Sequence, residues 1–308
     1  MQTTKLSDKV SVRTFPKPPA GFDPLTSDPR LLSQYGYPKK PSDPTMAARW
    51  EEMMRRGPKF VDPEFAPKPR KQRRLPKKML DHGVENTDIW SGAVVHAPAG
   101  DSFMWVEGTY TIPDAYPPGG AQDGVWYSAS TWVGIDGLDG SGDVLQAGCD
   151  SDVQKSGSSD SRQLNPWWEW YPAGSFWITT LKVVPGDTVN TLICVTSGST
   201  TQATVYLYNL TSNIGVHFLA DATAPTTLVG NVAEWVVERL SINTDSPELA
   251  QYGEVFFSEM NAGTVKGKLL QGGTGNTINM VDTSNNVLSE GIILTPTAVE
   301  VKYVGPLS

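Results

Sequence analysis

Two polar side chains stand inside strand-like apolar runs of this 308-residue sequence, and their chemistry suits hydrolysis. Gln146 lies in Leu145-Gln146-Ala147-Gly148, and Glu238 ends the run Ala233–Glu238. A polar group in an apolar strand needs a hydrogen-bond partner or a task. A carboxylate there can take a proton from water and later deliver one to a leaving amine. A neutral amide cannot be the base, but its N–H groups can donate to an oxyanion.

The alternation of side chains along a strand decides which face each polar group occupies. In the run Ala233–Glu238, a period of two puts Glu234 and Glu238 on one face and Trp235 on the other. Each candidate also has an ordinary interpretation. A glutamate on an exposed strand is common, and a glutamine such as Gln146 can be held in a core by backbone hydrogen bonds.

Two aromatic segments accompany these polar residues in the sequence. They are Trp132–Gly137 and Trp167–Pro172. In the second segment Glu169 stands between two tryptophans, where desolvation would raise its pKa and favour a neutral hydrogen-bond donor at low pH. For these two tryptophans, Trp168 and Trp170, core packing is the interpretation we favour.

Taken in order, these four segments resemble those of the glutamic peptidases (eqolisins), acid-acting endopeptidases that use a glutamine and a glutamate. The resemblance covers most of the chain after about residue 86. It implies that Glu238 acts as general base and then general acid, that Gln146 stabilises the oxyanion, and that no cofactor is required. It also implies that five further residues line or support the groove: Trp90, Trp132, Asp136, Glu169 and Tyr171.

The sequence departs from the family pattern around the groove. Asn165 stands where related enzymes often have an acid, and Cys149 stands where an apolar or aromatic residue is usual. The Ser- and Gly-rich stretch 151–160 is longer than usual. None of these differences touches Gln146 or Glu238, but they leave the peptide preference open.

Other catalytic schemes find little support in the sequence. Its three histidines, His82, His96 and His217, form no His-Glu-x-x-His motif, and the cysteines lack the spacing of a zinc site. There is also no Gly-x-Ser-x-Gly elbow and no Asp-Thr-Gly or Asp-Ser-Gly pair. Zinc, serine and aspartic peptidase mechanisms are therefore unsupported.

Two alternatives use the same residues for another purpose. Paired carboxylates in an aromatic groove can hydrolyse sugars, which would require Glu169 and Glu238 to face each other. A non-catalytic module could instead bind peptide or carbohydrate by stacking it on Trp90, Trp132 and Tyr171. Such a module would show binding without turnover.

The elements that must position these residues are strands. From Trp90 to Val304, short runs rich in β-branched and aromatic residues alternate with Gly, Pro, Asn and Asp, without helical spacing. This pattern predicts an all-β sandwich. The resemblance specifies two curved antiparallel sheets, of concanavalin-like or jelly-roll type, with a concave substrate groove. We expect residues 86–308 to form this domain.

Residues 1–85 differ from the rest in composition and charge. They are rich in proline and carry 18 Lys and Arg against 10 Asp and Glu, whereas the remaining residues carry 7 against 23. We expect a largely irregular segment with one amphipathic helix, Thr45–Arg56, and a solvated, flexible polybasic run from Lys68 to Lys78. The opposite charges predict that the segment and the domain attract each other.

This arrangement indicates an enzyme made as a zymogen. Residues 1–85 would be a pro-segment, inhibitory or chaperone-like, released as acid protonates carboxylates and cut near Arg70–Lys78. The expected partners are polypeptide substrates and this segment, acting as an intramolecular inhibitor, with no nucleic acid, no membrane and a monomeric state. A basic tail that binds membrane or nucleic acid is the alternative.

Export from the cell is a weaker inference. No stretch approaches the ~18 apolar residues of a membrane span, and the N-terminal residues lack the apolar core of a secretory signal. The sequon Asn209-Leu210-Thr211 hints at export, and we expect an extracellular enzyme. Whether Cys149 and Cys194 pair cannot be read from the sequence.

Overall fold

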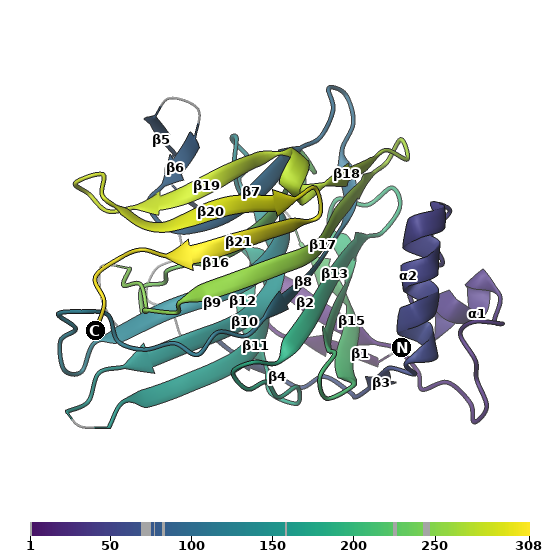
Figure 1. Ribbon diagram of the computed structural model, residues 1–308. Helices are drawn as coiled ribbons and strands as arrows, with labels where there is room; N and C mark the ends of the chain where they lie inside the picture. Colours follow the sequence, from purple (N-terminus) through teal and green to yellow (C-terminus); the bar gives the residue numbers. More distant parts are fainter. Residues whose placement is uncertain are drawn as a thin grey trace.

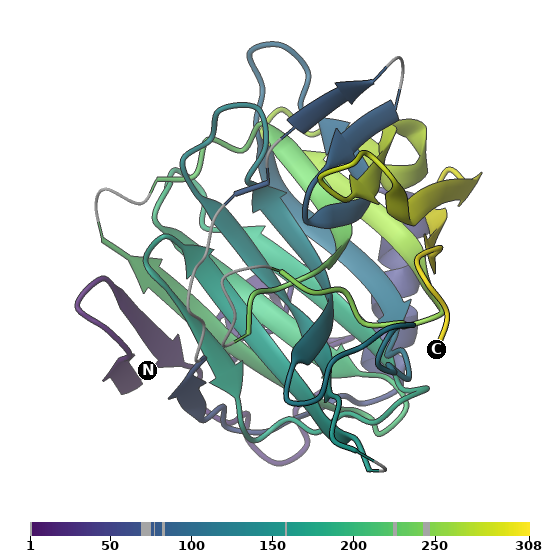
Figure 2. The same cartoon turned by 90° about the vertical axis from the view of Figure 1, so that its left-hand side faces the viewer.

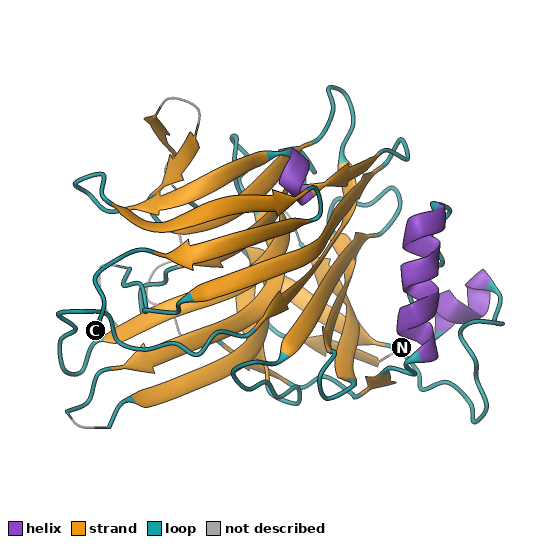
Figure 3. Ribbon diagram, in the orientation of Figure 1, coloured by secondary structure: helices purple, strands orange, loops and turns teal. Residues whose placement is uncertain are grey.

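The computed structural model describes residues 2–68, 75–76, 78–81, 84–157, 159–223, 227–242 and 247–308. Its architecture is two packed layers of β-strands (Figure 1). Within the described residues, helix is confined to two N-terminal helices and one short 3-10 turn (Figure 3). None of the described helices is long and apolar enough to span a membrane. The predicted all-β sandwich is therefore confirmed.

The first layer, here called the front sheet, contains the segments singled out by their chemistry. In spatial order its antiparallel strands are β12 (Gly174–Ile178), β11 (Ser161–Tyr171), β10 (Val144–Gln154), β9 (Trp126–Asp136), β16 (Val232–Glu238), β7 (Trp90–His96) and β19 (Asn276–Val281). The four motif segments thus lie on neighbouring strands, although they are far apart in the chain.

The second layer, the back sheet, packs against the front sheet. Its strands are β20 (Val287–Thr295), β21 (Ala298–Tyr303), β17 (Glu254–Thr264), β8 (Phe103–Thr111), β13 (Thr188–Val195), β14 (Gln202–Asn209) and β15 (Ile214–Ala222). A short strand, β18 (Leu269–Gln271), pairs with β17 and leads into the turn η1 (Gly272–Thr274). Pairing of β19 with β20 joins the two sheets on one side.

The hydrophobic core fills the space between the sheets. The largest side chains in it are fully buried aromatics from both layers: Trp168, Trp170 and Trp235 from the front sheet, and Tyr110, Phe218 and Phe257 from the back sheet. The core-packing interpretation of Trp168 and Trp170 is confirmed. Truncating one such tryptophan to alanine is expected to cost about 3–5 kcal/mol of stability.

The N-terminal residues extend the sandwich at both of its open edges. On the back sheet, β2 (Val10–Thr14) pairs with β15 and with β1 (Gln2–Lys5), and β3 (Lys59–Phe60) also pairs with β15. Figure 2 shows the hairpin of β1 and β2 in purple at the edge of the molecule. On the front sheet, β4 (Phe65–Pro67) pairs with β12, while β5 (Lys78–Asp81) and β6 (Val84–Thr87) form a hairpin beside β19. Unpaired sheet edges supply hydrogen bonds to this segment, so it contains more strand than its composition suggested.

Two helices of the N-terminal segment begin at Asp-Pro pairs. Helix α1 (Pro29–Gln34) is capped by Asp28, and helix α2 (Pro44–Arg55) by Asp43. Each aspartate accepts backbone N–H bonds of the first turn, and each proline fills the first helical position, where no N–H is needed. The helix predicted over Thr45–Arg56 is confirmed as α2. Both helices lie outside the back sheet (Figure 1).

Candidate active site

One surface of the front sheet, turned away from the core, carries both predicted catalytic residues. We call it the polar face and define it by Ser130, Trp132, Gly134, Gln146, Asp150, Trp167, Glu169, Glu234 and Glu238. The sheet register fixes their neighbours: Gln146 pairs with Gly134 and Glu169, while Ser130 pairs with Glu238 and Asp150. The period-two alternation of adjacent strands therefore gathers these residues on one side.

Glu238 is held in place by an aromatic residue of the same face. Trp132 Nε1 donates a hydrogen bond to Glu238 Oε2 at 3.0 Å, and the glutamate is only 7 % exposed. Trp132 in turn packs edge-on against Trp90, with ring centroids 4.8 Å apart. A donated hydrogen bond favours the ionised carboxylate and fixes its orientation.

Gln146 is held in a similar way by Glu169. Gln146 Nε2 donates to Glu169 Oε2 at 2.9 Å, and both side chains are buried. Gln146 Oε1 accepts no hydrogen bond from any described residue. A buried acceptor without a partner is costly, so this oxygen is suited to receive a donor that arrives with a substrate or a water molecule.

Glycines in two of the motifs make room on the polar face. A Cβ at Gly148 would lie 2.1 Å from Thr131 O and 2.5 Å from Trp132 Cβ, so only glycine lets β9 and the Trp132 side chain approach this closely. Gly134 pairs with both Gln146 and Glu234, and a Cβ there would lie 3.0 Å from Trp132 Cζ3, so glycine lets the Trp132 ring lie close to this part of the sheet. These contacts explain the glycines of Leu-Gln-Ala-Gly and Trp-Val-Gly.

Asp136 and Tyr171 lie at the strand ends of the same sheet. Asp136 is fully buried, and its carboxylate accepts backbone N–H bonds from Val229, Gly230 and Asn231 at 2.7–2.9 Å. Burial raises the pKa of Asp136, while these amides act in the opposite direction. Asp136 thus anchors the chain that leads into β16. Tyr171 is half-buried, and direct contact of either residue with substrate stays a prediction.

The sequence interpretation overlooked Asp150, an acid that the structure places next to the predicted catalytic residues. Asp150 is fully buried; its Oδ1 accepts from Ser130 Oγ at 2.7 Å and its Oδ2 from Trp177 Nε1 at 3.4 Å. Trp167 Nε1 donates to the same serine at 3.1 Å. The sequence could have identified Asp150, because the alternation of side chains from Gln146 along β10 puts residue 150 on the same face.

The partner of Asp150 comes from the N-terminal segment. Lys68 follows β4, donates its backbone N–H to Ser175 O at 3.1 Å, and reaches over the front sheet. Its Nζ donates to Asp150 Oδ1 at 2.6 Å, also contacts Oδ2, and lies 4.1 Å from the centroid of the Trp167 ring. Lys68 is 9 % exposed, so this ion pair is buried on the polar face. The expectation of a solvated polybasic run is therefore wrong for Lys68, because its charge is paired with a buried carboxylate.

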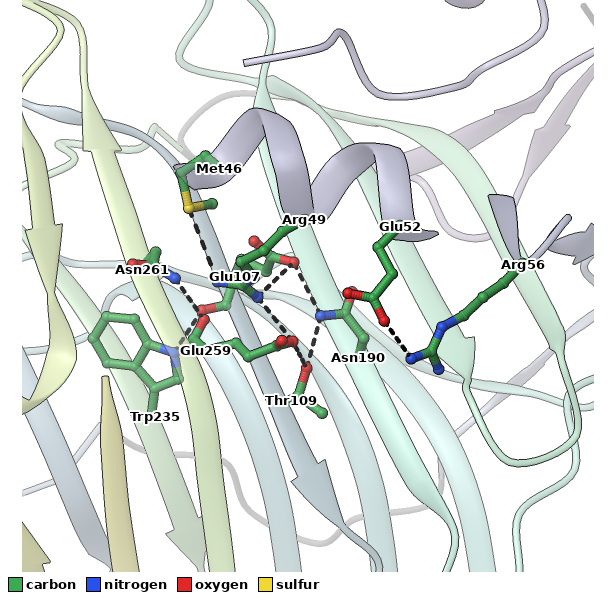
Figure 4. A network of polar contacts seen from close by, with 10 residues as sticks. All are labelled: Met46, Arg49, Glu52, Arg56, Glu107, Thr109, Asn190, Trp235, Glu259 and Asn261. Atoms are coloured by element: carbon green, nitrogen blue, oxygen red, sulfur yellow. Dashed lines mark hydrogen bonds and ion pairs between the residues drawn. The ribbon is translucent and has the colours of Figure 1, made fainter. Parts of the chain in front are cut away.

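Arg49 of helix α2 makes a second ion-pair cluster, on the outer side of the back sheet (Figure 4). Arg49 lies 2.8 Å from Glu259 and 3.7 Å from Glu107, and Asn190 and Thr109 complete the network. Burial raises the pKa of Glu107, and Arg49 partly offsets this.

A third pair joins Arg13 of β2 to Asp221 of β15 at 2.9 Å. At all three places, Lys68, Arg49 and Arg13, a basic residue of the first 85 meets an acid of the remaining chain. The charge asymmetry of the sequence is therefore realised as direct contacts.

Three further sequence features can be placed in the structure. Among the described residues, no group of three or more His, Cys, Asp or Glu side chains is placed to hold a metal ion. Cys149 and Cys194 are free thiols. Asn209 of the sequon is 1 % exposed and its Nδ2 donates to Asp187 Oδ2 at 2.7 Å, so its amide is not free to carry a glycan in the folded chain. The hint of export that the sequon provided is thereby removed.

Known proteins are similar to this chain in sequence. The model of the peptidase A4 family matches residues 88–303. Aspergillopepsin-2 of Aspergillus niger is 29% identical over 234 residues, which cover 71% of this chain and 79% of that protein. Scytalidopepsin B of Scytalidium lignicola is 30% identical over 149 residues, 48% of this chain and 50% of that protein.

Solved structures show the same fold. A scytalido-glutamic peptidase bound to a peptide-based transition state analog superposes with a TM-score of 0.57 and 23% identity, covering 70% of this chain and 98% of that one. The aspergilloglutamic peptidase from Aspergillus niger superposes with a TM-score of 0.50 and 25% identity, covering 58% and 99%.

Proposed function

Since the chain belongs to the peptidase A4 family and is a glutamic endopeptidase, we propose that Glu238 and Gln146 form its catalytic dyad. The observation that carries this proposal is their position on one polar face, each held by a neighbour on that face. Trp132 orients the carboxylate, and Glu169 orients the amide. Glu238 and Gln146 thus supply a base and a neutral hydrogen-bond donor on the polar face.

The reaction follows from the two functional groups. Glu238 takes a proton from a water molecule, whose oxygen attacks the carbonyl carbon of the scissile peptide bond. Gln146 Nε2 donates to the oxyanion of the tetrahedral intermediate, while its Oε1 helps to orient the water. Glu238 then gives the proton to the leaving nitrogen as the C–N bond breaks. The products are a carboxylic acid and an amine, and Glu238 is ionised again.

Residues around the dyad complete the groove in this proposal. Trp90 and Trp132 line it beside Glu238, Glu169 supports Gln146, and Asp136 and Tyr171 shape its end. A glycoside hydrolase that uses Glu169 and Glu238 is not favoured, because the relatives found are peptidases and Glu169 is engaged with Gln146. A non-catalytic module is not favoured either, because the relatives found are peptidases.

The N-terminal segment, residues 1–85, acts in this proposal as an inhibitory pro-segment. The support is Lys68, whose ammonium group occupies the polar face beside the dyad. Two more ion pairs, from Arg13 and Arg49, and strand pairing at both sheet edges hold the segment to residues 86–308. Acid weakens these contacts as carboxylates protonate, and the segment is released. The predicted cleavage stretch, Arg70–Lys78, lies largely outside the described residues.

The test compares the full chain with two variants, Glu238→Gln and Gln146→Ala, between about pH 2 and pH 7. We expect acid to trigger removal of the N-terminal segment and hydrolysis of a denatured protein in the native chain only. Glu254→Gln, a change at the exposed first residue of β17 in the back sheet, is the matched control and should retain activity. Full activity in Glu238→Gln would contradict the proposed base.

Processing is followed in the same samples by mass. If wild-type enzyme added in trans trims the Glu238→Gln chain without restoring its activity, the defect lies in catalysis rather than in folding. A full chain that already hydrolyses protein at neutral pH, with its segment intact, would contradict inhibition by the segment. We further propose an extracellular monomer, which secretion of the natural protein and its mass in solution would test.

A further inference from the structure

We propose that Asp143 is a positioning residue of the active site. While its carboxyl group is neutral, Asp143 holds residues 137–143, here called the β9–β10 turn, against Trp90, and its ionisation at higher pH loosens this turn. The inference rests on the proposed peptidase function and concerns what sets the upper pH limit of its activity.

The first support is the apolar contact that the β9–β10 turn makes with the polar face. Leu138 is 3 % exposed and belongs to a hydrophobic cluster with Trp90, Trp132 and Val94. Gly137 has a φ of 108°, and a Cβ there would lie 2.6 Å from Trp90 Cη2. The backbone of the turn therefore lies directly on the Trp90 ring and fixes the position of that ring.

The second support is the chain of contacts from Trp90 to the proposed base. Trp90 packs edge-on against Trp132, with ring centroids 4.8 Å apart, and Trp132 Nε1 donates to Glu238 Oε2. Because protein interiors are close-packed, a side chain that loses its neighbour also loses its fixed position. A displaced turn would therefore change the orientation of Glu238 through two aromatic rings.

The third support is that Ser141 ties the turn together. Ser141 Oγ accepts from the Gly137 N–H at 2.6 Å and lies 3.2 Å from the carbonyl oxygens of both Leu138 and Asp143. The Ser141 N–H donates to the same Leu138 oxygen at 3.2 Å. What holds Asp143 in place therefore also holds Gly137 and Leu138 on the Trp90 ring.

The surroundings of Asp143 suit a neutral carboxyl group better than a charged one. Asp143 is 3 % exposed, its Oδ2 accepts from Trp170 Nε1 at 3.3 Å, and its Oδ1 accepts no hydrogen bond from any described residue. The groups that face it are this indole on β11, the carboxyl group of Asp136 on β9 and the backbone of Thr227. A buried carboxylate with so few donors, beside a second acid, is unfavourable.

The pH dependence of the turn follows from these surroundings. Burial raises the pKa of Asp143 to about 6; Trp170 acts in the opposite direction, and Asp136 adds to the rise. Below about pH 4 the carboxyl group is neutral whether the turn is closed or open, so closure is strongest there. Between about pH 4 and pH 6 only the open turn lets it ionise, and the closing equilibrium falls by up to roughly a hundredfold.

The experiment measures kcat/KM for one uncharged peptide between about pH 3 and pH 7 on acid-activated enzyme. Asp143→Asn cannot ionise but keeps an acceptor for Trp170 Nε1. We expect this variant to move the alkaline limb upward by roughly one pH unit, with a rate in acid within about twofold of the native rate. Asp139→Asn is the matched control, because it removes a carboxyl group of the same turn that is partly exposed and paired with His96, and its limb should not move.

A second measurement does not depend on activity. In the full Glu238→Gln chain, hydrogen-exchange protection of the β9–β10 turn, corrected for the intrinsic exchange rate, should fall as pH rises from about 4 to about 7. Adding Asp143→Asn should remove most of this decrease.

Two results would overturn the inference. One is an alkaline limb that stays in place in Asp143→Asn, or turn protection that does not change with pH. The other is loss of activity at every pH in Asp143→Asn, because asparagine imitates the neutral carboxyl group. If exchange behaves as expected while no chain hydrolyses peptide, the proposed peptidase function fails, whereas the coupling of Asp143 to the turn is confirmed.

Discussion

At the scale of single residues, each side chain of the proposed dyad is paired on the polar face with a neighbour that orients it. Trp132 donates to Glu238, and Glu169 accepts from Gln146. Neither neighbour is placed to react itself in the proposed mechanism, so both are positioning residues. In the proposed mechanism their contribution is to fix the direction of two buried side chains, where water cannot compensate for a lost hydrogen bond.

Replacement of Trp132 by phenylalanine tests this positioning. Trp132→Phe keeps an aromatic ring but removes the Nε1 donor, so the Glu238 carboxylate becomes harder to ionise. Because the base must be ionised to act, we expect the acidic limb of the kcat/KM profile to move to higher pH and the maximum to fall roughly tenfold. The measurement is a pH–rate profile on one peptide.

Trp105→Phe is the matched control for Trp132→Phe, since Trp105 lies on β8 of the back sheet. We expect its profile to coincide with that of the native enzyme. If Trp132→Phe lowered the rate equally at all pH values, Trp132 would contribute packing alone.

At the scale of elements, the N-terminal segment builds an aromatic enclosure around a histidine of the back sheet. His217 on β15 stacks on Phe60 with centroids 4.1 Å apart, contacts Phe15 and Tyr37, and its Nδ1 lies 2.9 Å from Gly36 O. All four of these neighbours belong to the segment. Burial lowers the pKa of His217 to about 4, while the Gly36 carbonyl and Asp62 act in the opposite direction.

We expect this enclosure to make docking of the segment sensitive to acid. Above about pH 6.5 the imidazole is neutral in both the docked and the released state, so docking is unaffected. Between pH 6.5 and about 4 only the released state takes up the proton, and docking loses up to about 3 kcal/mol. We expect the segment to be held at neutral pH and weakened in this window.

The measurement is hydrogen-exchange protection of α2, corrected for the intrinsic exchange rate, in the Glu238→Gln chain. Protection should fall as pH drops from 6.5 towards 4, and His217→Phe should remove most of this decrease. His96→Gln is the control, because His96 is on the front sheet, away from the back-sheet enclosure. Equal pH dependence in all three chains would exclude His217 as the sensor.

At the scale of the whole molecule, the segment and the domain are held by charges of different exposure. Arg13–Asp221 and Arg49–Glu259 are partly exposed, whereas Lys68–Asp150 is buried. The segment also covers both open edges of the sandwich, at β12 and at β15. Its removal therefore exposes two strand edges together with the polar face.

Salt and acid should consequently have different effects. At about 1 M NaCl the screening length is about 3 Å, which weakens the exposed pairs but hardly affects a buried one. We expect salt at neutral pH to loosen α2 without opening the polar face. Binding of a labelled peptide to the Glu238→Gln chain measures the opening.

The comparison is the Glu238→Gln chain that also carries Lys68→Met. We expect salt to increase peptide binding by this double variant. If the Glu238→Gln chain, with Lys68 in place, bound the peptide strongly in salt alone, the exposed ion pairs rather than Lys68 would close the groove.

Local sequence patterns predicted a large part of this architecture. Strand alternation put Glu234 and Glu238 on one face, the spacing of apolar residues identified α2, and turn residues separated the strands, because each depends only on neighbours along the chain. The extra strands of the N-terminal segment were not predicted. They form because the edges of β12 and β15 offer hydrogen bonds, and a sequence does not show which edges are open.

The sequence by itself determined the family, the sandwich and the face of the strand on which each side chain lies, since these follow from residue types and short spacings. Only the tertiary structure decided that Lys68 meets Asp150, that His217 is enclosed by the N-terminal segment, and that Asn209 is buried. The physical reason is that burial and charge pairing depend on contacts between residues far apart in the chain. Strand register, which brings Ser130 between Glu238 and Asp150, is set by the packing of the whole sheet.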